Sequence, residues 1–269
     1  MRPFRITTTD YQRAIAIDAS TIGSITVTVA VSATRSEELD ILDNIYSAAD
    51  DHPFFPFRDK GHDIDYDRNA ELFENIVSEN SHRIQATTHL GQDGSDQERI
   101  EAVQSAVLVN NLNTSDTLII LDGDDDKVNR FSRASSGLSG EVPPVVTCIQ
   151  SELYYPASLL ADLCASHLAR QISHPRHCSV VVPSAPITKQ KFSQYWGKAY
   201  NSMVTGSSKA GSEPIEQRRG ETVPARMNCW FNGYMGGGEP VELETSTKPI
   251  VEYVKQEGYD ELASRLSDI

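Results

Sequence analysis

Two short apolar runs that end in aspartate constrain the fold of this chain most. The run RAIAIDAS contains Asp18, and the run DTLIILDGD contains Asp122. Apolar runs of this length, bounded by turn residues, are typical of buried strands. The second is apolar at each of its four positions from Leu118 to Leu121, directly before Asp122, which predicts a central strand covered on both faces. We therefore expect a sheet that presents carboxylates at the ends of its inner strands.

The segments around these runs predict a regular alternation of helices and strands. GSITVTVAVSA predicts a strand joined to the first run by a tight turn near residues 21–23. Asp67 is the expected N-cap of a second helix, and Ser95, with Glu98 in a capping box, that of a third. The resulting order predicts an α/β fold, a mixed sheet flanked by helices. We expect helices at 35–50, 65–80, 94–112 and 156–172, further strands at 82–90 and 143–150, and irregular structure at 124–143.

The character of the sequence changes near residue 175. We expect one domain over 1–175 and a C-terminal extension over 176–269, which is partly helical and includes a mobile loop at 205–225 that is poor in apolar residues. The last 20 residues predict a helix broken near Gly258. This extension could also offer a surface to a protein partner.

The acidic net charge of the chain limits the classes of function that it can have. The chain has 269 residues and a net charge of −14, with 16 arginines and 8 lysines among its bases. Acidic surface with scarce lysine indicates a halophilic protein of haloarchaeal origin. Bulk attraction to phosphate is then weak, so nucleic-acid binding would need locally placed bases and metal ions. We find no apolar run of roughly 20 residues and no signal peptide, and therefore expect a cytoplasmic protein that does not enter a membrane.

Carboxylates on adjacent strands favour a metal site. Asp18 and Asp122 would repel each other unless a cation lay between them, and Mg²⁺ or Mn²⁺ prefers such oxygen ligands. Glu152 follows the strand at 143–150, and Asp162 borders the apolar face of the last predicted helix, so both could complete the site. The competing interpretation is that these aspartates are simply turn residues at the ends of strands and bind no metal.

At this point four segments resemble the ribonuclease H type 2 family in order and spacing. The resemblance places Asp18 and Asp122 at catalytic acids, and Asp59 and Lys60 at a loop in which Lys60 could meet a phosphate or stay solvated. It covers residues 13 to about 172, and it implies a ribonuclease-H-like fold. The four segments are AIAIDAS with ITVTVAV, FRDKGHDIDYDRNAELFENI, QERIEAVQSAVLVNNLNTSDTLIILDGD and VVTCIQSELYYPASLLADL.

The sequence also departs from that family. Ala19 stands where the family has glutamate, and Ser20 and Thr21 stand in place of the Gly-Arg-Gly segment that reads the ribose 2′-hydroxyl. Asp162 stands where the family has lysine, and an acid on that helix is similar to Holliday-junction resolvases. Tyr200, in a basic and aromatic stretch at 188–203, would correspond to a tyrosine that stacks near the ribose, although an ordinary amphipathic helix explains that stretch as well.

Two function classes follow. The first is a metal-dependent endonuclease that hydrolyses the RNA strand of RNA–DNA hybrids or, like a resolvase, structured DNA. Asp18, Asp122, Glu152 and Asp162 would be catalytic, and Asp18, Asp122 and Asp162 would hold Mg²⁺ or Mn²⁺. The second is a ribonuclease-H-like domain that has lost catalysis and serves binding or assembly, which Ala19 favours.

Overall fold

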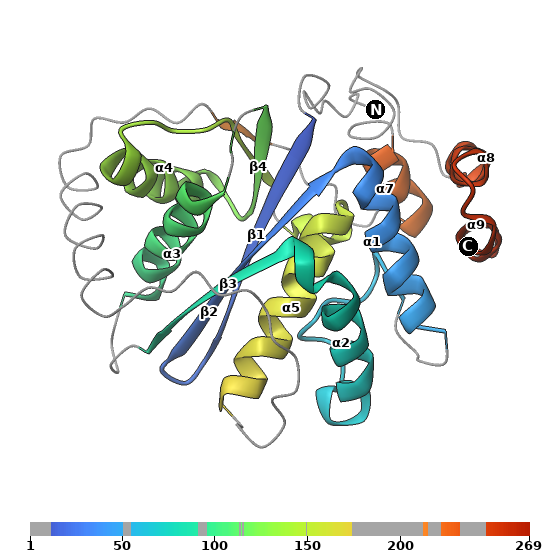
Figure 1. The fold of residues 1–269 in the computed structure, drawn as a ribbon, viewed down its shortest axis with the longest axis horizontal. Coiled ribbons are helices and arrows are strands. Elements are labelled where there is room, and N and C mark those ends of the chain that lie inside the picture. The colour runs from blue at the N-terminus through green and yellow to red at the C-terminus, as the bar shows by residue number, and fades with distance from the viewer. Residues whose placement is uncertain are drawn as a thin grey trace.

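The fold is a mixed sheet covered on both faces by helices (Figure 1), as expected. The structure is a computed structural model that describes residues 12–50, 55–90, 96–112, 114, 116–148, 150–173, 212–214, 222–231 and 246–269. The strand order is β3-β2-β1-β4-β5-β6. The antiparallel pairs are β1–β2 and β2–β3, whereas β4, β5 and β6 extend the sheet parallel to β1. The strands are β1 (Arg13–Ile22), β2 (Ile25–Thr34), β3 (Ile84–Leu90), β4 (Thr117–Asp122), β5 (Val145–Cys148) and β6 (Ser212–Pro214).

The hairpin between β1 and β2 is longer than the sequence predicts. Its turn lies at Gly23 and Ser24, because Ile22 pairs directly with Ile25, and Gly23 has a φ of +60°. The turn predicted near 21–23 therefore shares Gly23 with the observed turn but begins two residues too early. A two-residue turn that needs a positive φ selects glycine, and here the glycine takes the first turn position rather than the last.

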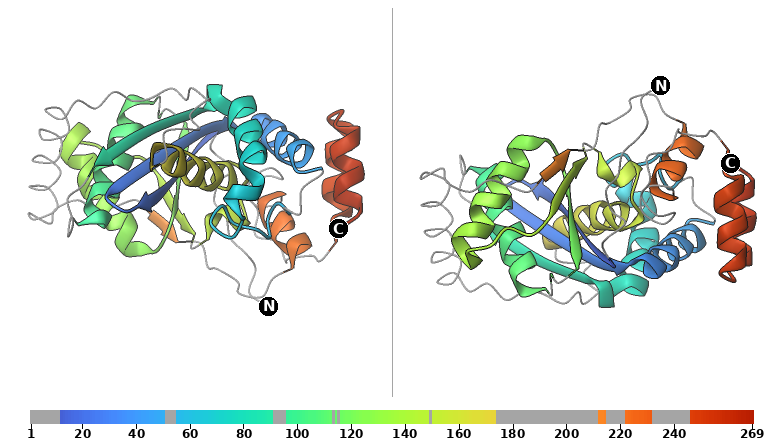
Figure 2. Two further views of the ribbon diagram at one scale, coloured as in Figure 1. Left: turned by 90° about the horizontal axis from the view of Figure 1, so that it is seen from below. Right: turned by 90° about the horizontal axis from the view of Figure 1, so that it is seen from above.

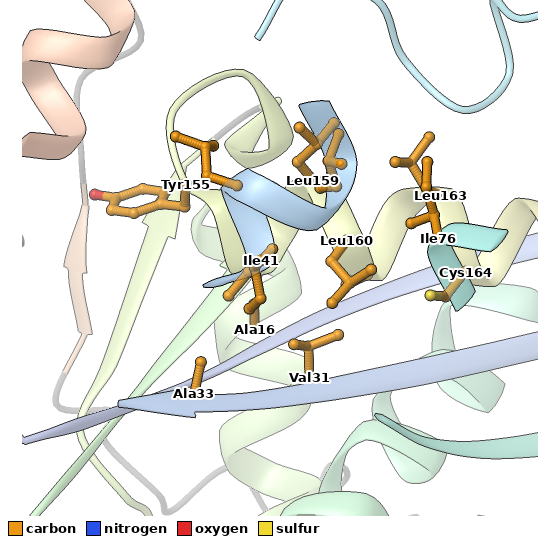
Figure 3. Close-up of a cluster of buried hydrophobic side chains, with 14 of the residues drawn as sticks. Ala16, Val31, Ala33, Ile41, Ile76, Tyr155, Leu159, Leu160, Leu163 and Cys164 are labelled. Carbon is orange, nitrogen blue, oxygen red and sulfur yellow. The ribbon is translucent and has the colours of Figure 1, made fainter. Parts of the chain in front are cut away.

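In the described part of the chain up to residue 173, one group of helices covers one face of the sheet and a second group covers the other (Figures 1 and 2). The first group is α1 (Arg35–Ala48), α2 (Tyr66–Asn80) and α5 (Pro156–Ser173), and the second is α3 (Gln97–Asn111) and α4 (Asp125–Ser139). On the first face Leu160 of α5 packs over Ala16 and Val31 (Figure 3). The smaller core on the second face includes Ile15 and Ile17. Alternate residues of β1 therefore point into two different cores.

The helix α4 corrects the prediction of irregular structure at 124–143. Asp124 is its N-cap, and the side chain accepts hydrogen bonds from the backbone N–H groups of Asp126 and Lys127, each at 3.1 Å. Val128 and Phe131 are buried under the sheet, and Gly140 ends the helix with a φ of +80°. Val128, Phe131, Ala134 and Leu138 recur at helical spacing, but the residues between them are mostly polar, which is why the segment has the composition of a loop.

The N-caps of α2 and α3 lie one or two residues away from the positions that the sequence predicts. Helix α2 is capped at Asp65, and Asp67 lies within its first turn. Helix α3 is capped by Asp96, whose side chain accepts from the backbone N–H of Arg99, whereas Ser95 lies outside the described residues. Aspartate and serine are nearly equivalent caps, so a run of such residues leaves the cap position ambiguous.

The C-terminal helices join the core on the α5 side of the sheet. They are α7 (Val223–Trp230), α8 (Lys248–Gln256) and α9 (Asp260–Ser267), and the predicted break near Gly258 is confirmed by its φ of +91°. Trp230, Ile250 and Leu262 are completely buried there. Of the segment 205–225, the structure describes β6 and the residues from 222 onward. In the described part of the chain, no helix has the length and apolar character needed to cross a bilayer.

Candidate metal and nucleic-acid site

The parallel pairing of β1 with β4 brings two predicted acids side by side. Arg13–Ile17 pair with Thr117–Leu121, so Asp18 and Asp122 each follow the last residue of that register. Asp18 does not end its strand, as the sequence suggested, because β1 continues with β2 as a hairpin and Asp18 lies opposite Val29. Both aspartates are two residues beyond side chains of the α5-side core, and strand alternation points them to that face.

The helix α5 supplies the third carboxylate. Asp162 is buried, and its Oδ2 accepts a hydrogen bond of 2.5 Å from the backbone N–H of Gly61. A Cβ atom at Gly61 would lie 2.8 Å from Ser166 Oγ and 3.0 Å from Asp162 Oδ2. Only glycine lets the loop backbone come this close to α5, so the loop that carries Lys60 and Gly61 fixes one oxygen of Asp162.

The fourth predicted acid, Glu152, forms an ion pair with a lysine. Glu152 lies in the short helix η2 (Ser151–Leu153) and is 3% exposed, and its carboxylate forms an ion pair with Lys60. The backbone N–H of Ser151 donates to Asp122 Oδ1 at 3.0 Å. As placed, Glu152 therefore neutralises Lys60, while its neighbour anchors the carboxylate of Asp122.

The acids interact strongly with one another. Burial, followed by the negative charges of Asp162 and Asp122, raises the pKa of Asp18 well above its usual value. Burial also raises the pKa of Asp162, against the hydrogen bond from Gly61. Burial and the charge of Asp122 raise the pKa of Glu152 to about 7, although Lys60 opposes the shift. The site therefore carries an excess of negative charge, which a cation would relieve.

A second lysine, Lys127, approaches this site, and the sequence reasoning missed it. It lies in the first turn of α4, and its ammonium group is 3.7 Å from Glu101 of α3. Burial alone would lower the pKa of Lys127, but the charges of Asp18 and Glu101 raise it overall. Lys127 lies five residues after Asp122. A helix predicted to start directly after Asp122 would have placed Lys127 in its first turn, close to the end of β4.

The remaining predicted substrate residues are placed differently from one another. Ser20 lies two residues beyond Asp18 and so faces the same side of the sheet. Thr21 faces the other side, where its hydroxyl is 3.1 Å from that of Thr26. Asp59 accepts from the backbone N–H of Phe55 at 2.8 Å and so stabilises the loop itself. Tyr200 lies outside the described residues.

The oxygen donors suit a hard divalent cation. Asp122 and Asp162 each have one oxygen held by a backbone N–H group, which leaves the second oxygen to face a ligand. Carboxylate oxygens are the ligands that Mg²⁺ and Mn²⁺ prefer. Among the described residues, however, no three acidic, histidine or cysteine side chains are placed so that they could hold a metal ion between them. The donor chemistry therefore fits, and a bound cation would have to draw the carboxylates closer.

Comparison with known proteins gives weak likenesses. No protein-family model and no curated protein matches the sequence. A ribonuclease HII in a PCNA complex from Archaeoglobus fulgidus is 16% identical, with a TM-score of 0.39, over 61% of this chain and 75% of that one. A mutant of Bst-RNase HIII is 12% identical, with a TM-score of 0.43, over 74% and 71%. Ribonuclease H2 from Pyrococcus horikoshii is 14% identical, with a TM-score of 0.41, over 95% and 97%. Likenesses at this level identify no function.

Proposed function

We propose that this chain is a metal-dependent endonuclease of ribonuclease H type 2 ancestry. Its preferred substrate would be the RNA strand of RNA–DNA hybrids. The observation that carries the proposal is the gathering of Asp18, Asp122 and Asp162 from β1, β4 and α5 with mutual repulsion that no described cation fully offsets. Folding such a cluster costs free energy, and a site for a divalent cation explains why that cost is tolerated.

Each residue has a definable role in such a reaction. Asp18, Asp122 and Asp162 would hold Mg²⁺ or Mn²⁺, which when bound polarises the phosphate and lowers the pKa of water. The hydrogen bonds from Ser151 and Gly61 would keep two of these carboxylates oriented. Lys60 would contact the phosphate only by leaving Glu152. Ser20 and Tyr200 are the proposed contacts to the substrate strand, whereas Thr21 faces the opposite side of the sheet and contacts Thr26.

The testing experiment is cleavage of labelled substrates in high KCl with Mg²⁺ or Mn²⁺. The panel contains an RNA–DNA hybrid, a duplex with one embedded ribonucleotide, single strands and a four-way junction. We expect Asp122→Asn to reduce cleavage on the order of a hundredfold or more. Asp126→Asn is the matched control, because Asp126 is exposed on the first turn of α4 and loses the same charge. Equal activity of wild type and Asp122→Asn would refute the proposal.

Two alternatives rest on particular observations. The ion pair between Glu152 and Lys60, together with Ala19 at the position after Asp18, favours a domain that has lost catalysis and only binds nucleic acid or a protein partner. Binding of the hybrid without cleavage of any substrate would support this non-catalytic alternative.

The acid on α5, Asp162, favours a resolvase-like nuclease instead, and preferential cleavage of the four-way junction would support that alternative.

The cellular setting is also a proposal. The excess of acids over lysines supports a halophilic, cytoplasmic protein of haloarchaeal origin, in which high salt screens the repulsion between surface carboxylates. A refolding experiment between 0.2 and 3 M KCl would test it, since a halophilic protein gains stability over this range.

A further inference from the structure

A cavity lies at the end of β1, where the β1–β2 hairpin, the start of α2 and the end of α5 meet. Its volume is about 610 Å³, which is in the range of pockets that bind a small ligand. Ile22 of the hairpin, Tyr66 of α2 and Arg170 of α5 line it, together with the aspartates at positions 63, 65 and 67. Ile22 packs against the α5-side core, so the cavity lies on the same face of the sheet as the candidate acids.

The cavity follows the candidate acids along two neighbouring elements. β1 and α5 lie side by side and run in the same direction (Figure 1). Ile22 follows Asp18 by four residues on one side of the strand, which is about 13 Å. Arg170 follows Asp162 by eight residues along one side of the helix, which is about 12 Å. Since a nucleic-acid strand advances about 3.4 Å per nucleotide, a strand bound at the acids would reach the cavity roughly three or four nucleotides away.

Arg170 is a cation in the wall of this cavity, and no described carboxylate forms an ion pair with it. Its guanidinium carbon lies 4.8 Å from the centre of the Tyr66 ring, which holds the side chain in place. Its Nη1 atom is buried and has no hydrogen-bond partner among the described residues. A guanidinium group in this position still has a donor to offer, and an anionic ligand is the acceptor that suits it best.

The rim of the cavity carries aspartates, and two of them have partners close by in the sequence. The carboxylate of Asp63 lies 3.2 Å from the ring of His62, and that of Asp65 lies 3.3 Å from Arg68. Asp67, in the first turn of α2, is exposed and forms no ion pair within the described part of the chain. Such a rim repels an anion that offers it no donor, but it accepts hydrogen bonds from a ligand that carries hydroxyl groups as well as a negative charge.

We propose that this cavity binds one ribonucleotide of a nucleic-acid strand, with Arg170 on its phosphate and Asp67 on its ribose 2′-hydroxyl. The inference rests on the proposed function and names the unit of the substrate that is recognised. A guanidinium group matches a phosphate through two parallel hydrogen bonds, and carboxylates accept from ribose hydroxyls in dinucleotide-binding proteins. The 2′-hydroxyl is the group by which a protein distinguishes RNA from DNA. The cavity would therefore select a strand that contains ribose.

The test is a calorimetric titration of the full chain with mononucleotides in high KCl and EDTA, where no divalent cation contributes. We expect AMP to bind on the order of tenfold more tightly than dAMP or adenosine, and a short single-stranded RNA to displace it. Arg170→Met keeps an unbranched side chain over Tyr66 and should weaken AMP binding by about tenfold or more. Asp67→Ala should bind AMP and dAMP equally. Arg130→Met is the matched control, because it removes the same charge from α4 on the other face of the sheet, and it should bind AMP as the wild type does.

Several outcomes would overturn the inference. They are the absence of AMP binding, equal affinity of the wild type for AMP and dAMP, and unchanged affinity in an Arg170→Met variant that circular dichroism shows to be folded. Bound AMP that the RNA does not displace would indicate a site for free nucleotides and would overturn recognition of a strand. The comparison of AMP with dAMP on the wild type is decisive even where a variant fails to fold.

These outcomes are separate from the test of the proposed function. Binding in EDTA involves no cleavage, so the cavity can fail to bind AMP while Asp122→Asn still abolishes metal-dependent cleavage. Conversely, a chain that cleaves no substrate can still bind AMP through Arg170, which would leave the cavity as the recognition site of a non-catalytic domain.

Discussion

A buried carboxyl group away from the candidate site shows how one residue can set the pH dependence of the whole fold. Glu38 of α1 is completely buried, and its Oε2 accepts a hydrogen bond of 3.1 Å from the backbone N–H of Ala157 at the start of α5. Burial raises its pKa from 4.5 to about 8. At neutral pH, folding therefore favours the protonated form of this side chain.

The first prediction concerns Glu38→Gln. The stabilisation that comes from a neutral Glu38 is complete below pH 4.5, and it is lost as the pH rises through about 8. Glutamine keeps an acceptor for Ala157 and never ionises. We therefore expect the variant to gain stability over wild type as pH rises from 6 to 9, by on the order of 1–3 kcal/mol.

Urea unfolding at pH 5, 7 and 9 measures this gain. The matched control is Glu37→Gln at the partly exposed capping-box neighbour, whose carboxylate accepts from the Thr34 backbone N–H at 2.6 Å and should give no gain at high pH. A constant difference between Glu38→Gln and wild type at all three pH values would contradict the prediction.

At the scale of single residues, sequence reasoning found the acids but not their pairing. The sequence predicts Asp18, Asp122 and Asp162 as site residues from the periodicity of strands and helix faces, although β1 continues beyond Asp18 to Ile22. The pairing of Lys60 with Glu152 joins residues 92 positions apart (152 minus 60) through a loop with no period. Nothing in the local pattern encodes such a contact, so it could only be seen in three dimensions.

At the scale of elements, α4 is the helix that the sequence analysis does not predict. Asp124 caps it through the backbone N–H groups of Asp126 and Lys127, and the Lys127 side chain forms an ion pair with Glu101 of α3. The other main strands and helices between residues 13 and 173 agree with the sequence prediction, and the four helices among them are less polar than α4. Helix α4 has few apolar positions, and its stability depends on the cap and on packing under the sheet.

The second prediction concerns the cap. Asp124→Ala leaves two N–H groups of the first turn without an acceptor, and we expect a loss of about 1 kcal/mol in the free energy of unfolding. Asp124→Ser should restore most of it, because serine also caps. Asp126→Ala, at an exposed side chain of the same turn, is the control and should change stability by less than about 0.5 kcal/mol. Chemical denaturation measures all three, and equal stability of Asp124→Ala and Asp126→Ala would refute the role of the cap.

At the scale of the whole molecule, the C-terminal helices support the part of the chain that carries the candidate site. Arg226 of α7 donates to the backbone carbonyl of Phe57 at 2.8 Å, and the rings of Phe57 and Trp230 are 6.3 Å apart. Phe57 has a φ of +63° and lies within the turn that precedes Lys60 and Gly61. The division near residue 175 thus marks a change in sequence character, and we propose that the two parts fold as one unit.

The last prediction tests this cooperativity. Leu262 of α9 is completely buried in the same core as Leu160 of α5. We expect Leu262→Ala to lower the stability of the entire protein by about 2–4 kcal/mol, as truncation of a buried leucine does, while unfolding stays a single transition. Differential scanning calorimetry compares the calorimetric and van't Hoff enthalpies. Glu261→Ala, an exposed neighbour in the same helix, is the control. If Leu262→Ala instead split the transition in two, with the main part unshifted, residues 176–269 would be an independent domain and the site would not depend on them for its stability.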